Sequence, residues 1–312
     1  MTKDTTTFVS PEFGIRFENY LNIYHGMGDK VDPAKISHFI DLTPEQSSDY
    51  ESFVKEVEAH DFDAVAADTT EDNCSIPYVL PDKITLLRFL MADDFKSDLA
   101  LQRLENTVKF QQEQRLAEKI STTPPRLNLY RRIRVRANMG RTKDGMPIFV
   151  ERLGGFMNAI PSKEGKSFSN DEWIHCFFYD LAELIREIKD SYEFAEKNQS
   201  PAITWKVTWI MDAKGISYYK ALKSLSVIKL LDNLMEPNFP EIAGPIYMIN
   251  VPYIVSGIWK LAKAFLDPAV VAKIQISSGV PKEVLLERID ESVLFQEYGG
   301  MNKKEFPKSE YV

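Results

Sequence analysis

The apolar stretch Ile246–Ile276 limits the fold of this chain more than any other feature. It opens with a run of strand length, Ile246–Val251, and from Ile254 onward its apolar residues recur at helical spacing. Only a narrow polar stripe, which includes Lys260 and Lys263, interrupts the helical part. A helix with so little polar surface must bury most of its circumference, or cover an apolar body that is present only part of the time.

The residues after this helix complete a strand–helix–strand order. Asp267-Pro268 is expected to end the helix, because the residue before a proline disfavours helical backbone angles. A second short apolar strand, Lys273–Ser277, follows. On pattern alone, the simplest interpretation is a core helix in an α/β domain.

Helical and strand patterns alternate from about residue 130 onward, which predicts an α/β sheet of about five strands, mostly parallel and covered mainly by helices. The expected helices are Glu45–Ala59, Lys83–Ala92 with Asp82 as its N-cap, one running from Ser97 as N-cap to about Lys119, Asp171–Lys197 with a capping box at Ser169, and Lys282–Arg288. Further strands are expected at Arg126–Arg136 with a basic face, at Met146–Leu153 ending at Gly154-Gly155, and at Thr204–Met211. The expected connections are a linker at Asp61–Pro81, a turn at Lys143-Asp144-Gly145 and a loop at Pro237–Pro245.

The charge of the chain argues against a nucleic-acid partner. The formal net charge is −8, whereas nucleic-acid binding depends on neutralising phosphates with cations. Residues 1–82 hold 17 acidic and 5 basic side chains, a net charge of −12 that leaves about +4 for the remainder. The acidic N-terminal segment is therefore a candidate surface for a protein partner.

Two cysteines, Cys74 and Cys176, lie far apart and make no metal-like spacing, which favours a reducing, intracellular location. No apolar run approaches the roughly 20 residues that cross a bilayer. The first residues resemble neither a signal peptide nor a mitochondrial presequence. We therefore expect a cytoplasmic protein with peripheral association at membranes.

The sequence contains none of the usual motifs of an enzyme. It has no GxSxG nucleophile elbow, P-loop, dinucleotide-type glycine run, HExxH or CxxC pattern. His175 falls in a helical apolar run and is expected to be a core or interface histidine. Asp212 ends a buried strand, where α/β enzymes often place catalytic groups, but we expect it to cap the turn that follows. No catalytic residue, metal or cofactor is predicted.

Five segments in order carry a resemblance to a known family. They are Thr85–Phe95 (TLLRFLMADDF), Thr142–Gly154 (TKDGMPIFVERLG), Trp209–Ser217 (WIMDAKGIS), the stretch IYMINVPYIVSGIWKLAKAFLDPAVVAKI from Ile246, and Phe295–Gly300 (FQEYGG). Together they resemble the Sec14-like (CRAL-TRIO) lipid-binding family over roughly residues 76–305. The resemblance implies a lipid in a hydrophobic pocket, with the apolar helix as a mobile gate over it.

The resemblance also implies a division of the chain. Residues 1–75 would be an acidic, partly helical N-terminal extension outside the family match, and we expect it to be dispensable for lipid loading. Residues 76–125 would be the N-terminal helices of the family, residues 126–305 the lipid-binding domain, and residues 306–312 a tail.

Candidate site residues follow from the resemblance, segment by segment. The gate helix would comprise Tyr253, Ile254, Ile258, Trp259, Leu261, Ala262, Phe265 and Leu266, with Lys260 and Lys263 at the membrane. The pocket would be lined by Phe149, Val207, Trp209, Met211, Tyr247, Ile249 and Val270. Glu241 and Lys273 match the family's positions for a lipid headgroup.

Other positions depart from the family pattern for phosphatidylinositol and phosphatidylcholine. The headgroup arginine of the family falls on Asp93, which reverses the charge, and a threonine falls on Val270. Polar positions for the choline lipid fall on Val207, Trp209 and Phe149. We therefore expect a more apolar ligand, such as a sterol, isoprenoid or fatty acid, or a phospholipid held differently.

The resemblance thus implies a protein that binds one hydrophobic molecule in a gated pocket and transfers or presents it at membranes, with transient membrane contact. An alternative is a Sec14-like fold that serves as a structural or scaffold subunit, docked through the acidic N-terminal segment.

Overall fold

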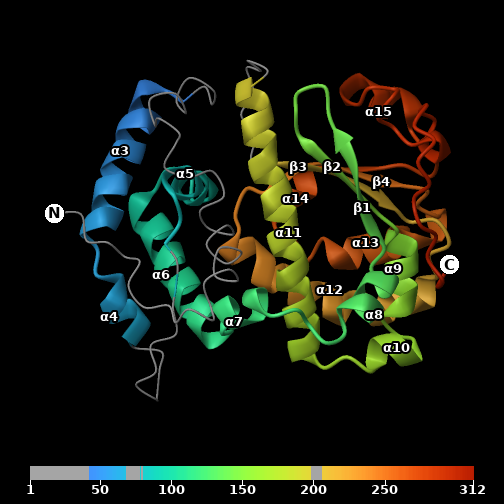
Figure 1. Cartoon of the computed structure of the whole chain (residues 1–312), viewed down its shortest axis with the longest axis horizontal. Helices are drawn as coiled ribbons and strands as arrows, with labels where there is room; N and C mark the ends of the chain where they lie inside the picture. The colour runs from blue at the N-terminus through green and yellow to red at the C-terminus, as the bar shows by residue number, and fades with distance from the viewer. Residues whose placement is uncertain (1–41, 68–77, 79, 198–205) are drawn as a thin grey trace. The chain divides into compact units, whose positions relative to one another are not determined.

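The structure of the protein is a computed structural model that describes residues 42–67, 78, 80–197 and 206–312 (Figure 1). It divides into two units along the chain. Unit 1 takes the chain up to Pro124 together with His175–Arg186, and unit 2 takes Pro125–Ile174 together with Glu187–Val312. The long helix α11 (Asn170–Lys197) therefore contributes to both units.

Unit 1 is built from helices. Besides its part of α11 it contains α3 (Pro44–Ala59), α4 (Phe62–Ala67), α5 (Lys83–Ala92), α6 (Ser97–Glu113) and α7 (Leu116–Ser121). The Asp82 side chain caps α5 by accepting a hydrogen bond from the Thr85 amide at 2.7 Å, as predicted. α3 starts with a capping box between Thr43 and Gln46. Nearly all of α5 is buried, so it forms the centre of this unit.

The helices before residue 76 are part of the core of unit 1. Phe53 on α3 is fully buried, and Phe62 on α4 is 3% exposed. The Tyr50 hydroxyl donates a 2.7 Å hydrogen bond to the Lys83 carbonyl at the start of α5. The predicted boundary between residues 75 and 76 therefore falls inside unit 1, although whether residues 1–75 are needed for lipid loading stays a prediction.

Unit 2 contains a five-stranded sheet in the order β1-β2-β3-β4-β5. The strands are β1 (Arg136–Arg141), β2 (Pro147–Glu151), β3 (Val207–Asp212), β4 (Ala243–Ile249) and β5 (Ile274–Ile276). β1 and β2 form an antiparallel hairpin, and the other three pairings are parallel. This confirms the predicted α/β class with a mostly parallel sheet of about five strands.

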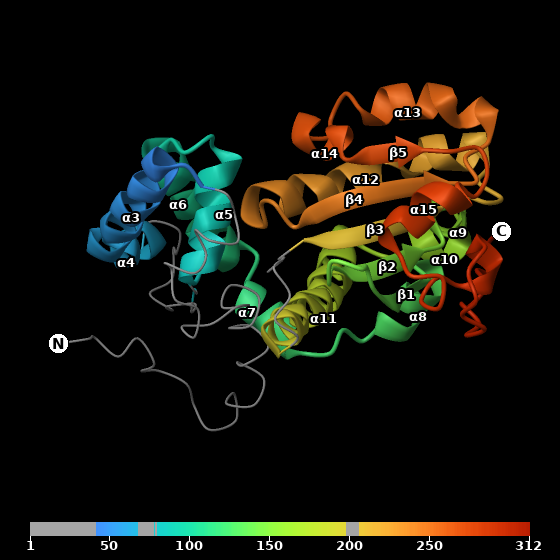
Figure 2. The same cartoon turned by 90° about the horizontal axis from the view of Figure 1, so that it is seen from above.

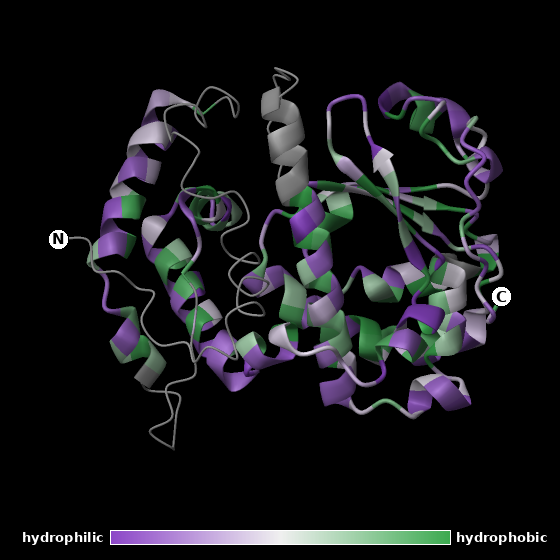
Figure 3. Cartoon of the chain, viewed as in Figure 1, coloured by the Kyte–Doolittle hydropathy of each residue, from purple (hydrophilic) through white to green (hydrophobic). Residues whose placement is uncertain are grey.

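Helices connect the parallel strands, because parallel neighbours require long crossovers. The crossover from β2 to β3 contains α9 (Leu153–Ala159), α10 (Lys163–Lys166) and α11, and the crossover from β3 to β4 contains α12 (Tyr218–Asn238). The crossover from β4 to β5 contains the 3-10 turn η1 (Tyr253–Val255), α13 (Ser256–Ala262) and α14 (Pro268–Ala272). Outside these crossovers, α8 (Leu127–Ile133) precedes β1, and α15 (Lys282–Arg288) and η2 (Gln296–Tyr298) follow β5. The chain passes from β4 through η1, α13 and α14 into β5 (Figure 2). Figure 3 shows hydrophobic residues along the central strands and polar residues at the tip of the β1–β2 hairpin.

The two faces of the sheet pack against different helices. Ile210, Tyr247 and Ile249 lie in a core cluster with Leu285 of α15. Met248 instead packs against a cluster that contains Ile258 of α13 and residues of α9 and α12. Successive residues of a strand point to opposite faces, so these two clusters lie on opposite sides of β4.

Several sequence expectations for the helices are wrong. Arg126–Arg136 is not a strand, because Leu127, Tyr130 and Ile133 recur every three residues and are buried on one side of α8. The helix expected to run from Ser97 to Lys119 ends at Glu113, because Arg115 adopts a left-handed φ of 48°.

Ser97 is the first residue of α6 rather than its side-chain cap, and part of the expected linker at 61–81 forms α4. Gly154-Gly155 belongs to α9 rather than to the end of a strand. A β-carbon at Gly154 would collide with the Lys214 carbonyl, so this close helix–turn approach requires glycine. The expected loop Pro237–Pro245 is shorter, since α12 runs through Pro237 and β4 begins at Ala243.

The apolar stretch also differs from the single helix that was expected. α13 ends at Ala262, and residues 263–265 form a turn. Asp267 does not stop a helix but starts one, because its carboxylate accepts hydrogen bonds from the Ala269 and Val270 amides at 2.7 and 3.2 Å. Pro268 then occupies the first turn of α14.

Replacing Phe53 with alanine should destabilise unit 1 by about 3 to 5 kcal/mol, because it removes a fully buried ring. Urea unfolding measures this loss. The exposed neighbour Glu51, changed to alanine, serves as the control and should alter the free energy of unfolding by less than about 0.5 kcal/mol. Equal effects of the two changes would show that α3 does not contribute to the folded core.

Candidate functional site

The predicted gate residues lie on η1, α13 and the turn after it, and much of their apolar surface is exposed. Tyr253 is 93% exposed, Ile254 66% and Leu261 49%, whereas Ile258 is buried at 4%. Trp259, Ala262, Phe265 and Leu266 are half-buried. Among the described side chains of η1 and α13, Ile258 is the one that anchors the segment in the core. A group of exposed large apolar residues indicates an interaction surface for another protein, a ligand or a membrane.

The start of α12 extends this exposed surface. Tyr218, Tyr219 and Leu222 are 40, 64 and 39% exposed. The Tyr218 ring lies 3.9 Å from the position of a β-carbon at Gly257, so the two helices meet there. We call Tyr218, Tyr219, Leu222, Tyr253, Ile254 and Leu261 the α12–α13 patch. Sequence reasoning missed its α12 part, because Tyr218, Tyr219 and Leu222 lie before the apolar residues Leu225, Ile228, Leu231 and Met235 that recur at helical spacing.

Cationic side chains accompany the α12–α13 patch. Lys260 and Lys263, the predicted membrane contacts, are both exposed. The Lys263 ammonium lies over the Trp259 ring, 5.6 Å from its centroid, and Lys223 lies over the Tyr219 ring at 4.2 Å. Aromatic rings that are paired with lysines suit an interface between water and an apolar phase.

The predicted pocket-lining residues divide between the two faces of the sheet. The rings of Phe149 and Trp209 contact each other with centroids 5.5 Å apart, and Met211 follows on the same face. In the parallel register Trp209 pairs with Ile246 and Met211 with Met248. Ile246 and Met248 are therefore on the face of Trp209, and both were missed from sequence.

Tyr247 and Ile249 lie on the other face, which corrects their assignment to the same lining. They are buried in the cluster under α15. Alternate residues of a strand point to opposite faces, so a shift of one residue along β4 exchanges the two faces. The sequence prediction took the set of alternate residues that points away from Trp209. Val207 is fully buried, and Val270 is half-buried on α14.

The two predicted headgroup residues do lie together. The Lys273 ammonium is 3.3 Å from each carboxylate oxygen of Glu241. A third residue, Lys206, lies 2.8 Å from Glu241 Oε2 and was not predicted. Burial alone would raise the pKa of Glu241, but its bonds to the two lysines outweigh burial and lower that pKa below its usual value. Glu241 is therefore ionised at neutral pH.

Asp93, at the family's arginine position, is already paired within unit 1. The Arg103 guanidinium donates to both of its carboxylate oxygens, at 2.8 and 2.9 Å. This bidentate pair balances the charge of Asp93. Reversal of charge at this position thus has a structural explanation that the sequence pattern did not give.

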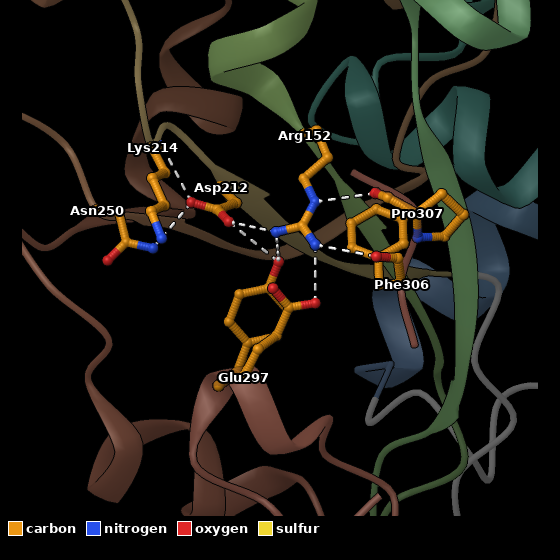
Figure 4. Close-up of polar contacts among 8 residues, drawn as sticks. Arg152, Asp212, Lys214, Asn250, Glu297, Phe306 and Pro307 are labelled. Carbon is orange, nitrogen blue, oxygen red and sulfur yellow. Dashed lines mark hydrogen bonds and ion pairs between the residues drawn. The ribbon is translucent and has the colours of Figure 1, made fainter. Parts of the chain in front are cut away.

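A buried polar cluster lies at the carboxyl ends of β2, β3 and β4 (Figure 4). The Arg152 guanidinium lies 2.8 Å from Asp212 Oδ2, and it also donates to the Tyr298 hydroxyl at 3.1 Å and to the Glu297 carboxylate at 2.8 Å. Asp212 further accepts hydrogen bonds from the Asn250 amide at 2.8 Å and from the Lys214 main chain at 3.0 Å.

The contacts of this cluster hold several chain segments together. Asp212 is 2% exposed, and its oxygens are occupied by the partners in Figure 4. The predicted cap of the turn after β3 is confirmed. Arg152 also donates to the carbonyls of Phe306 and Pro307, so residues 306–312 are not a loose tail. No sequence motif indicates this network, because its members are far apart along the chain.

His175 is half-buried and bonds the Thr122 carbonyl at 3.0 Å, which suits a structural histidine. Residues 42–67, 78, 80–197 and 206–312 contain no cluster of side chains that could hold a metal ion. Over the same ranges no helix is long and apolar enough to cross a membrane.

A sequence model of the CRAL/TRIO domain matches residues 138–300, which is more than half of the chain. The chain therefore belongs to the CRAL/TRIO family, which confirms the resemblance.

Individual relatives agree with this assignment. The SEC14 cytosolic factor of Eremothecium gossypii is 29% identical over 229 residues, covering 71% of this chain and 70% of that protein. The phosphatidylinositol/phosphatidylcholine transfer protein SFH9 of Arabidopsis thaliana is 25% identical over 223 residues, covering 70% of this chain and 37% of that protein. The solved structure of Sfh5 matches with a TM-score of 0.59 at 15% identity, over 85% of this chain and 91% of that one, which supports the fold.

Replacing Arg152 with methionine should lower the free energy of unfolding by about 3 to 5 kcal/mol, because it leaves the buried Asp212 carboxylate without its cation. The matched control is Arg132→Met, which breaks an exposed ion pair with Glu310 and should change the free energy of unfolding far less, because solvent screens the pair. Urea unfolding of both variants measures the difference. Similar small losses would contradict a structural role for the cluster.

Asp232 on α12 should make stability depend on pH. Burial, with the nearby charges of Glu236 and Asp267, raises its pKa from 3.8 to about 6. Between these values the unfolded chain loses the proton and the folded chain keeps it, so stability falls as pH rises from about 4 to about 6. Asp232→Asn should therefore stabilise the protein more at pH 7 than at pH 4, as measured by urea unfolding.

The control for this prediction has the opposite sign. Hydrogen bonds from Ser292 lower the pKa of Asp290, so Asp290→Asn should destabilise the protein at pH 7 relative to pH 4. The same direction of change in both variants would contradict the assignment.

Proposed function

We propose that the protein binds a single lipid and moves or presents it at membranes, which it contacts through the α12–α13 patch. The observation that carries this proposal is the exposure of Tyr253, Ile254 and Leu261 on a segment edged by lysines. Transfer of such apolar side chains from water into the acyl chains of a membrane is favourable. The free energy gained is about 25 cal/mol per Å² of apolar surface removed from water. Adjacent lysines favour anionic headgroups, each by about 1 kcal/mol.

The proposed gate is η1 with α13. Support comes from its weak attachment: among its described side chains, Ile258 is the buried one. The turn at residues 263–265 and the new helix start at Asp267 separate it from α14, so it can shift without carrying β5 with it. Names of relatives, a cytosolic factor and a phospholipid transfer protein, are consistent with a cytosolic carrier.

The direct test incubates the purified protein with vesicles that contain phospholipids and a sterol, separates the two by gel filtration, and extracts lipid from the protein fraction. Lipid that travels with the protein and is delivered to acceptor vesicles supports the proposal. Recovery of no lipid from any vesicle composition would contradict it.

Replacing Lys260 and Lys263 with glutamate should weaken flotation with anionic vesicles by about tenfold or more at low salt, because four units of charge change at the patch. The fold should be intact by circular dichroism. The matched control replaces Lys303 and Lys304, two exposed lysines outside the patch, with glutamate. Equal loss in the control would mean that net charge, and not the patch, governs binding.

The protein should be a poor exchanger of phosphatidylinositol and phosphatidylcholine. Trp209 fills a position where the family places a hydroxyl for the choline lipid, and its ring packs on Phe149. Vesicle-to-vesicle transfer with each labelled lipid measures this. Efficient transfer of both lipids would refute the prediction.

A further inference from the structure

The chain returns to α9 at residues 309–312, which we call the strap, and Figure 1 and Figure 2 both show this end of the chain beside α9. Two glycines make room for it. A β-carbon at Gly155 of α9 would collide with the Ser309 side chain, and a β-carbon at Gly215 would collide with Val312. Gly215 also has a φ of 72°, which glycine adopts without strain. The strap is therefore packed closely on α9 and on the turn between β3 and α12.

A single buried amide joins the strap to that turn. Asn158 on α9 is 4% exposed. Its Nδ2 donates to the carbonyls of Gly215 and Tyr311, at 2.9 and 3.0 Å, and its Oδ1 accepts a hydrogen bond from the Ser217 amide at 2.9 Å. An asparagine side chain has two N–H donors, and here one serves the turn and the other serves the strap. Loss of the strap would leave a buried donor unpaired, which favours rotation of the amide away from the turn.

The start of α12 depends on this amide, because its own sequence does not cap it. Ser217 occupies the N-cap position, but its side chain makes no capping hydrogen bond. The first amides of a helix have no partner within the helix, and Asn158 supplies one from α9. Farther along, Ala221 is fully buried, and the Ser224 hydroxyl donates to the Met157 carbonyl at 2.6 Å. The segment before Ala221 is thus the part of α12 that the strap controls.

This segment carries two tyrosines of the α12–α13 patch. Tyr218 and Tyr219 follow Ser217 directly, and the Tyr218 ring reaches the position of a β-carbon at Gly257 on α13. A series of contacts therefore runs from the strap through Asn158 and the start of α12 to α13. Both tyrosines are exposed while the strap is docked, so the strap does not cover them.

We propose that the strap, acting through Asn158, positions the first turn of α12 so that the α12–α13 patch meets a membrane already in its binding conformation. This inference rests on the proposed membrane contact of the patch. Side chains that are held in their binding conformation lose less conformational entropy on association, so a docked strap strengthens membrane binding. A frayed first turn weakens it, because the turn must then be ordered at the membrane.

The test displaces the strap with Gly155→Ala, which adds the methyl group that collides with Ser309. Alanine favours a helix more than glycine does, so α9 itself is not weakened. Hydrogen–deuterium exchange is measured on peptides that cover residues 214–222, and flotation is measured with vesicles of phosphatidylcholine and phosphatidylserine. We expect faster exchange in these peptides and vesicle binding that is about threefold to tenfold weaker.

A second substitution supplies the rescue. Ser309→Gly removes the atoms with which the new methyl group collides. The double variant Gly155→Ala/Ser309→Gly should therefore behave like Ser309→Gly alone in both measurements, and not like Gly155→Ala. A double variant that exchanges and floats like Gly155→Ala would contradict displacement of the strap as the cause.

Two further variants separate the strap from general stability. Val312→Gly withdraws the side chain that covers Gly215 without adding a clash, and Val312 is 62% exposed, so folding does not depend on it. It should shift both measurements in the same direction as Gly155→Ala, and it replaces that variant if Gly155→Ala does not fold. Ile289→Val trims a fully buried side chain in the cluster with Leu285 of α15, away from the strap, and should leave both measurements unchanged.

Vesicle binding that is unchanged or stronger in Gly155→Ala and Val312→Gly would overturn the inference, and so would an equal loss in Ile289→Val. A wild-type protein that floats with no vesicle composition would instead overturn the proposed membrane contact.

Discussion

The buried ion pair between Arg152 and Asp212 is the interaction on which unit 2 depends. The 2.8 Å contact joins the carboxyl ends of β2 and β3, and the carbonyls of Phe306 and Pro307 bind the same guanidinium. A buried pair of this kind stabilises only when its remaining donors and acceptors are also satisfied. Tyr298 and Asn250 donate hydrogen bonds to the Asp212 carboxylate, so both of its oxygens have partners.

The amino edge of the same strands is organised differently. Lys206, Glu241 and Lys273 are partly exposed there, and Glu241 has a left-handed φ of 59°. The two ends of the parallel strands therefore differ in burial: Asp212 is buried at the carboxyl end, and the charged groups at the amino end are partly exposed. On one face of the sheet, α12 and α13 leave apolar side chains in solvent. An exposed apolar surface of this kind is consistent with the proposed function at membranes.

The fold could be predicted from sequence because it depends on local patterns and ordered motifs. The capping residues Asp82 and Ser169 and the run Lys282–Arg288 mark helices that the structure contains at those places. α8 was missed because Leu127 and Leu129, and farther on Ile133 and Val135, alternate with polar residues as in a strand, while the buried residues of α8 have helical spacing.

The site was only partly predictable, because contacts between distant strands decide it. Tyr247 and Ile249 were placed on the wrong face by one residue of phase, and Ile246 and Met248 were overlooked. Lys206 has no motif, and it matters only because β3 lies beside β4. Asp93 is a different case, because its departure from the family pattern was visible in the sequence. The structure explains this change of charge by the ion pair of Asp93 with Arg103, ten residues away.

Native mass spectrometry of the purified, full-length chain tests the central claim, one bound lipid per chain, most directly. The account predicts a species whose mass exceeds that of the polypeptide by one lipid, with a single stoichiometry that survives gentle activation. A spectrum that contains only the bare polypeptide after exposure to phospholipid and sterol vesicles, or a spread of variable lipid numbers, would contradict it.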